Sequence, residues 1–239
     1  MHDETKTIIC KNCGAKIDPS LKFCQECGSK TPKFIALEQK VLEEWNMVRI
    51  PDNTTHKGLY FGKYQVTQAQ WQAIMGYNPS SLYYGGDLSR PVESVSWNDC
   101  QWFIKKLNTR TEVKQAGLIF FLPTEEQWEY ACRAGRTGTY GLLADGRKGR
   151  LEKMGWYEDN SGMKTHPVGQ KKPNAWGLYD MHGNVWEWTA SADGSYHMGR
   201  GGGFQNQAYH CVSGSRFRSD PENMYYFLGF RLAASRTGK

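Results

Sequence analysis

Twelve residues in the second half of the chain, Gly177 to Trp188, constrain its fold more than any other stretch. They read Gly-Leu-Tyr-Asp-Met-His-Gly-Asn-Val-Trp-Glu-Trp, and because apolar residues do not recur every 3.6 positions, they do not predict a helix. Gly183 and Asn184 tolerate positive φ and therefore indicate a turn. Trp186 and Trp188 can each bury about 200 Å². The stretch predicts a tight turn that leads into a short strand, anchored by the two tryptophans.

The composition fits a globular protein with many loops. The chain has 239 residues, with 13% aromatic residues and 26 glycines, and this length allows one sizeable domain plus a small module. The net charge of +6 is scattered, which favours a solvated surface over a nucleic-acid-binding face. There is no run of 18 apolar residues and no apolar stretch after Met1 to Lys6. We therefore expect no membrane span, no secretion signal and a cytoplasmic protein.

Two C-x-x-C pairs near the N-terminus predict a metal site. Each pair is followed by a glycine that lets the backbone turn sharply, and the four cysteines are Cys10, Cys13, Cys24 and Cys27. Four thiolates in a tetrahedron favour zinc, and a site with four protein ligands is closed and structural. Residues 1–31 thus resemble the short zinc ribbons at the start of many bacterial proteins, whose role is usually interaction. The basic and aromatic residues that nucleic-acid binding would need are sparse here, so nucleic-acid binding by the ribbon is kept as an alternative to protein interaction.

Local signals predict several elements after the ribbon. Residues 32–45 fit a short amphipathic helix or an ordered linker. Strands are expected at 47–50 and 58–67. Helices are expected to begin after Thr67, Ser96 and Thr124, which can each cap a helix, and Cys100 lies on the apolar face of the second. Thr124 with Gln127 forms a capping box.

Four blocks of the chain resemble the formylglycine-generating, sulfatase-modifying family. They are Tyr64 to Trp71, Leu122 to Ala131, Gly177 to Trp188, and Arg200-Gly-Gly through Gly229-Phe-Arg-Leu-Ala233. The third block is the most specific. The resemblance implies an α+β protein in which residues 46–239 adopt an irregular C-type-lectin-like fold, preceded by the four-cysteine zinc ribbon.

The same resemblance bears on catalysis. Active members carry two cysteines, five residues apart, that hold copper and oxidise a protein cysteine to formylglycine. The matching positions here are Asn206 and Cys211, and one thiolate cannot form a linear dithiolate copper site. We therefore expect no copper and assign no catalytic residue. A formylglycine-type oxidase that uses Cys211 in another way remains the alternative.

The two carboxylates of the opening stretch have a counterpart in the family. The resemblance implies calcium bound by the side chains of Asp180 and Glu187 and by the backbone carbonyls of Gly183 and Val185. Hard oxygen ligands on a tight turn suit that ion. The alternative is that both carboxylates accept hydrogen bonds from backbone amides of the turn.

The segment between Phe204 and Phe227 predicts a binding surface. Its aromatic and small polar residues resemble the variable region of diversity-generating-retroelement proteins, and such residues combine rigid contact area with adaptable hydrogen bonding. The predicted ligand-binding residues are Phe204, Asn206, Tyr209, His210, Ser213, Ser215, Phe217, Ser219, Tyr225, Tyr226 and Phe227. We expect a non-catalytic protein that binds a macromolecular ligand through this segment. An ordinary polar loop is the alternative.

Overall fold

The computed structural model describes residues 8–18, 20–81, 86–141, 143 and 149–237. Met1 to Lys6, which bear on the secretion signal, lie outside these residues. The strands are β1 (Ile8–Ile9), β2 (Lys16–Ile17), β3 (Met47–Arg49), β4 (Tyr60–Gly62), β5 (Leu118–Phe121), β6 (Trp186–Asp193), β7 (Tyr196–Arg200), β8 (Arg216–Ser219), β9 (Leu228–Phe230) and β10 (Ala233–Arg236). The helices are α1 (Pro32–Glu44), α2 (Gln68–Met75), α3 (Trp97–Thr109), α4 (Thr111–Ala116), α5 (Glu125–Arg133), α6 (Leu151–Met154) and α7 (Glu158–Ser161), with a 3₁₀ turn, η2, at Ala208–His210.

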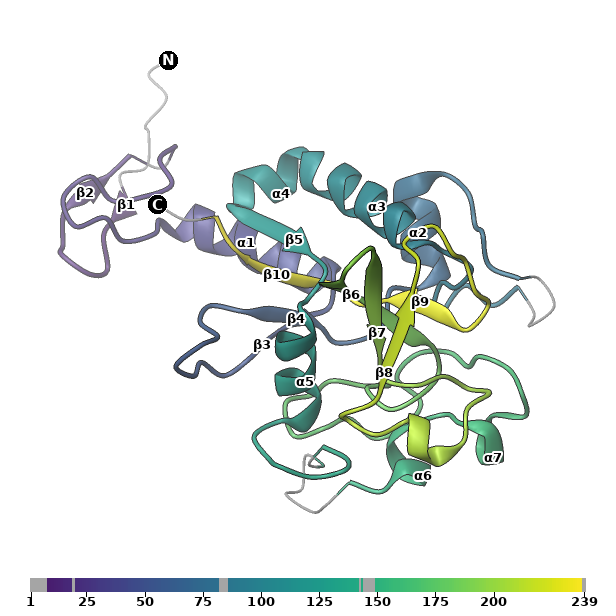
Figure 1. Ribbon diagram of the computed structural model, residues 1–239. Helices are drawn as coiled ribbons and strands as arrows, with labels where there is room; N and C mark the ends of the chain where they lie inside the picture. The colour runs from purple at the N-terminus through teal and green to yellow at the C-terminus, as the bar shows by residue number, and fades with distance from the viewer. Residues whose placement is uncertain (1–7, 19, 82–85, 142, 144–148, 238–239) are drawn as a thin grey trace.

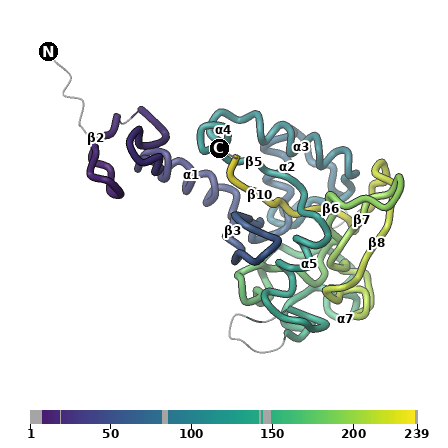
Figure 2. The backbone as a smooth tube through the Cα atoms, turned by 60° about the vertical axis from the view of Figure 1, so that its left-hand side comes forward, coloured from purple at the N-terminus to yellow at the C-terminus, as the bar shows by residue number. Residues whose placement is uncertain are grey.

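The N-terminal ribbon is a small hairpin module set apart from the rest of the molecule (Figures 1 and 2). Strands β1 and β2 pair antiparallel. Gly14 and Gly28 have φ of 73° and 69°, and their amides donate to the carbonyls of Cys10 and Cys24, each at 2.9 Å. The two glycines therefore close the two knuckles in the way that the sequence predicts.

Helix α1 begins directly after the ribbon and leads into the large domain. Thr31 caps it and donates its hydroxyl to the Leu21 carbonyl of the ribbon at 2.7 Å. At the other end, Val41 and Trp45 are buried in the main core. The sequence of residues 32–45 predicted either a short helix or an ordered linker. The structure shows a helix whose second half is part of the large domain.

Two four-stranded sheets form the large domain. One has the order β3-β4-β10-β5 and is antiparallel, with Ala233 of β10 opposite Phe61 on one side and Phe121 on the other. The second has the order β8-β7-β6-β9, in which β6 and β9 run parallel and Trp186 lies opposite Leu228. The last two strands of the chain thus complete both sheets.

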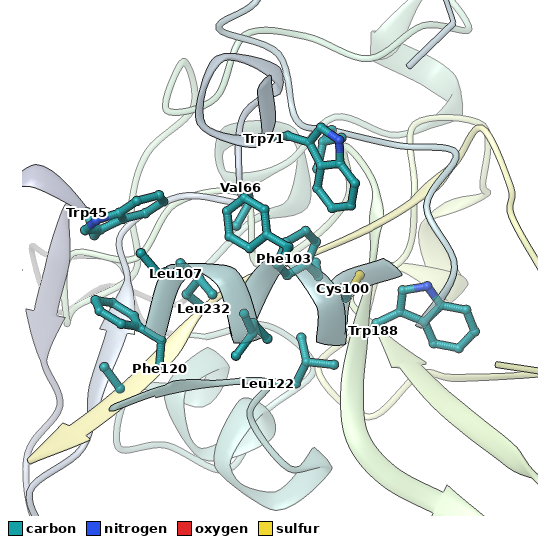
Figure 3. Packing of buried hydrophobic residues seen from close by; sticks show 14 of the residues in the cluster. Trp45, Val66, Trp71, Cys100, Phe103, Leu107, Phe120, Leu122, Trp188 and Leu232 are labelled. Carbon is teal, nitrogen blue, oxygen red and sulfur yellow. The ribbon is translucent and has the colours of Figure 1, made fainter. Parts of the chain in front are cut away.

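Local signals and core packing explain the helices. The caps at Thr67, Ser96 and Thr124 are all present, each within a capping box. Helix α3 packs its apolar face on the core, where Trp71 and Phe103 stack with ring centroids 5.3 Å apart (Figure 3). Cys100 is fully buried on that face, as predicted. The strand expected at 58–67 is shorter and spans only β4.

Candidate functional site

The four ribbon cysteines are placed to share one metal ion. The Sγ atoms of Cys10, Cys13, Cys24 and Cys27 all lie within 4.8 Å of one another. Ser29 Oγ is 3.1 Å from the Sγ atoms of Cys10 and Cys27 and lowers the pKa of both thiols, that of Cys27 to about 5. Among the residues that the structure describes, this is the one cluster of three or more His, Cys, Asp or Glu side chains so arranged. The cluster can hold a metal ion.

The stretch from Gly177 to Trp188 forms the predicted turn and strand. Gly183 has φ of 111° and Asn184 has φ of 65°, and β6 begins at Trp186. The Asn184 side chain pairs with both backbone polar groups of His166, each at 3.0 Å. Trp186 and Trp188 are both buried. The stretch is therefore an internal clasp of the fold and not an open cleft.

Glu187 is the most heavily contacted side chain of this clasp. Arg231 donates Nε to Oε2 at 3.0 Å and Nη2 to Oε1 at 2.8 Å, and Trp128 donates Nε1 to Oε2 at 2.6 Å. Arg231 also donates to the carbonyls of Gly62 and Tyr179, at 2.9 and 2.7 Å. Glu187, Arg231 and Trp128 are 0% exposed. A buried ion pair in which every guanidinium nitrogen has an acceptor holds β6, α5 and the segment before β10 together.

Four oxygens of the clasp surround the side-chain amide of Gln65. Gln65 Nε2 lies 2.9 Å from Val185 O, 2.9 Å from Glu187 Oε1, 3.3 Å from Asp180 O and 3.3 Å from Gly183 O. These include three of the oxygens implied as calcium ligands. The fourth differs, because Asp180 contributes its backbone carbonyl and not its carboxylate.

The Asp180 carboxylate makes a separate contact. Its Oδ2 accepts a hydrogen bond from the backbone N–H of Gly169 at 2.7 Å, so it does bind a backbone amide, though one outside the turn. The residue is 1% exposed with φ of 56°, and burial raises the pKa of its carboxyl to about 6. The two carboxylates therefore do not form an acid–base pair at a common opening.

Three of the predicted ligand-binding residues are buried in the structure. Phe204 and Ser213 are 0% exposed and Ser219 is 4% exposed. Ser213 hydrogen-bonds the Thr139 carbonyl through both its N–H and its hydroxyl. Phe204 lies in the interior, 6.1 Å from the Tyr226 ring. Their side chains pack in the protein interior and do not face solvent, so these residues anchor the segment.

The remaining predicted residues lie at least partly on the surface. Tyr209 is 63% exposed and Tyr226 is 44% exposed, and the neighbouring Met224, absent from the prediction, is 61% exposed. Tyr225 stacks on Phe227 with centroids 5.0 Å apart. The others of this half-exposed group are Asn206, His210, Ser215 and Phe217. Side chains of the segment are thus divided between an exposed face and a packed layer beneath it.

Asn206 and Cys211 occupy structural roles. Asn206 Oδ1 accepts from Trp186 Nε1 at 2.7 Å and from the Gly203 N–H at 3.0 Å, which fixes the turn that opens the segment. Cys211 is 0% exposed, and burial raises the pKa of its thiol to about 12. A buried, protonated thiol is a poor nucleophile and a poor metal ligand.

Sequence reasoning missed the partners that complete the clasp. Gln65 lies 122 positions from Glu187, and its place in the Tyr64 to Trp71 block did not indicate that it contacts the clasp. Arg231 stood in the Gly229-Phe-Arg block, but nothing in the sequence linked it to Glu187. A buried carboxylate needs donors, and this rule alone could have prompted a search for an arginine near Glu187.

The chain matches known proteins over most of its length. Residues 38–236 match the family of sulfatase-modifying factor enzyme 1-like domains. The chaperone protein LppX of Paenibacillus barcinonensis is 29% identical over 204 residues, covering 64% of this chain and 71% of LppX. The formylglycine-generating enzyme of Mus musculus is 29% identical over 204 residues, covering 71% of this chain and 50% of the enzyme. This chain therefore spans about half the length of that enzyme.

A solved structure shares the fold. Treponema denticola variable protein 1 superposes with a TM-score of 0.65 at 28% identity, covering 79% of this chain and 92% of that protein. No helix among the described residues is long and apolar enough to cross a membrane. The matched residues begin within α1, in agreement with the packing of its second half on the core. The family match covers most of the chain, and the fold and the four sequence blocks agree with it. This protein therefore belongs to the sulfatase-modifying factor enzyme 1-like domain family.

Proposed function

We propose that the large domain is a non-catalytic scaffold that binds a macromolecular ligand through the exposed face of residues 204–227. The observation that carries the proposal is the separation of this segment into buried anchors and exposed aromatic side chains. Tyr209 and Tyr226 present rigid, amphipathic area, and a rigid frame reduces the entropy that binding would otherwise cost. The chain shares its fold with Treponema denticola variable protein 1. This similarity supports the proposal that the fold is a constant scaffold whose surface residues differ between proteins.

An oxidase function has less support. Formylglycine generation in the family's active members depends, by resemblance, on a cysteine pair, and Asn206 here fixes a turn through Trp186 and Gly203. Relatives of this chain bear names as different as chaperone and enzyme. Family membership alone therefore does not select a reaction, and the residues at the site must decide.

Replacing Tyr209 and Tyr226 together with alanine should abolish ligand binding and leave the melting temperature nearly unchanged. Truncating a central aromatic residue of an interface often costs about 2 kcal/mol or more, so the double variant should bind at least ~100-fold more weakly. The ligand would be identified by photo-crosslinking from positions 209 and 226 and then titrated calorimetrically. Tyr225 is excluded from the variant because it stacks on Phe227 and is partly packed against the core.

A matched control is Trp102→Ala. Trp102 is 57% exposed on α3, outside the segment, so its loss should not alter affinity. Equal affinity of the double variant and the native protein, or equal loss in the control, would contradict the proposed surface.

We also propose that the ion of the four-cysteine cluster is zinc and that the ribbon is an interaction module whose fold depends on the metal. Zinc binding in such peptides contributes about 10–16 kcal/mol, and the ribbon's own core is limited to a few buried residues.

Removing the metal should therefore unfold the ribbon and leave the large domain folded. The purified protein should contain one zinc per chain by elemental analysis, and chelation should expose residues 8–30 to protease. A Cys13→Ser variant should already be sensitive and should not respond further to chelator. Metal-free protein with a protease-resistant ribbon would show that the ion is not structural.

A further inference from the structure

The point at which the clasp oxygens converge is filled by a side chain of the protein itself. An amide nitrogen has two hydrogens, and the 2.9 Å contacts of Gln65 Nε2 with Val185 O and Glu187 Oε1 account for both. The contacts with Asp180 O and Gly183 O, both 3.3 Å, are longer. Calcium takes six to eight oxygen ligands at about 2.3–2.6 Å, and these oxygens are spaced for a nitrogen donor instead.

The charge around this point is also already balanced. Glu187 is the single carboxylate that faces Gln65, and both its oxygens accept from the Arg231 guanidinium, whose side chain is 0% exposed. The other nearby acid, Asp180, directs its Oδ2 to Gly169. A divalent cation here would lie beside a buried guanidinium, and Glu187 is the one carboxylate that contacts the Gln65 amide at this point. The residues present do not fit a resident calcium ion.

We propose that the Gln65 amide, together with Arg231, replaces a metal ion in this clasp. The amide hydrogens bind oxygens that a cation would otherwise satisfy, and the guanidinium neutralises Glu187. The clasp of this chain is accordingly independent of calcium, and the identity of residue 65 decides whether a cation is required.

Gln65→Glu is the informative variant, because it exchanges the donor NH₂ for an anionic oxygen among four oxygens. The variant should melt several degrees below the native protein in metal-depleted, zinc-loaded buffer. Calcium at millimolar concentration should restore much of the loss, since a cation would then screen the added carboxylate. The native protein should show the same melting temperature from 0 to about 10 mM calcium, by scanning calorimetry.

Gln65→Met and terbium provide two further measurements. Gln65→Met removes the donor without adding charge, so it should melt lower with no recovery in calcium. Terbium, a calcium substitute excited by nearby tryptophans such as Trp128, should luminesce with Gln65→Glu and not with the native protein. The terbium measurement on the native protein decides the question even if Gln65→Glu fails to fold.

Two results would overturn the inference. A saturable rise in melting temperature of the zinc-loaded native protein with calcium, or its sensitised terbium luminescence, would place a cation where we place the amide. A folded Gln65→Glu protein that melts lower but ignores calcium would show that the amide does not occupy a cation position.

Discussion

Glu187→Gln should destabilise the large domain by about 3–5 kcal/mol, because breaking a buried ion pair leaves its partner charged and desolvated. The charge left behind is Arg231, which is 0% exposed and also holds two backbone carbonyls. Trp128 Nε1 would also lose its charged acceptor. Guanidinium unfolding of the zinc-loaded protein would measure the change in the free energy of unfolding. In a thermal scan, we expect the melting temperature to fall by about 10 °C or more.

The control for this variant is an ion pair of the same chemistry on the surface. Arg218 and Asp193 lie 3.5 Å apart with side chains that are 52% and 63% exposed. Asp193→Asn should leave the unfolding midpoint unchanged within error, since water and salt screen such pairs. If Glu187→Gln were no more harmful than Asp193→Asn, the clasp would not contribute to stability in the way we describe.

Gly183→Ala should prevent folding or cost several kcal/mol, because this position leaves no room for a side chain. A Cβ built on Gly183 would lie 2.2 Å from the Trp156 carbonyl oxygen, and φ at this residue is 111°. A contact that short can be relieved only by moving backbone. Soluble yield and denaturant unfolding of the purified variant would measure the effect.

Gly194→Ala separates the steric effect from the backbone effect. Gly194 also has positive φ, at 64°, but a Cβ there would meet no atom within 4 Å. Its substitution should therefore cost only the ~1–2 kcal/mol of a left-handed alanine. Equal losses for the two variants would mean that the turn at Gly183 can open to admit a methyl group.

Local features of the fold were predictable because their signals lie within a few residues. The caps at Thr67, Ser96 and Thr124 bond within their own first turn, so each helix start could be read directly from the sequence. The turn at Gly183 and Asn184 and the metal-site spacing of the cysteines are local in the same sense. The fold class was predicted from the resemblance of four sequence blocks to a known family.

Features that local signals could not predict depend on contacts distant in sequence. Ser213 and Ser219 share the polarity of the exposed residues around them, yet they lie beneath the surface. Composition identifies residue types that are common in binding surfaces, but it does not show on which face of an irregular loop each residue lies. Gln65 joined the candidate site only because the chain returns to it through the turn at Gly183, a contact with no local signal.

The position of the last strands sets a condition on how the domain is made. Strand β10 is an interior strand, flanked by β4 and β5, and β9 pairs with β6. During synthesis, one sheet therefore lacks β9 until residue 230 has emerged from the ribosome, and the other lacks β10 until residue 236 has emerged. Long-range pairing of this kind forms slowly. The ribbon, complete by residue 31, can hold a metal ion long before. Nascent chains of this protein thus carry a finished cysteine ribbon ahead of an unfinished domain, whose open strand edges need protection from aggregation.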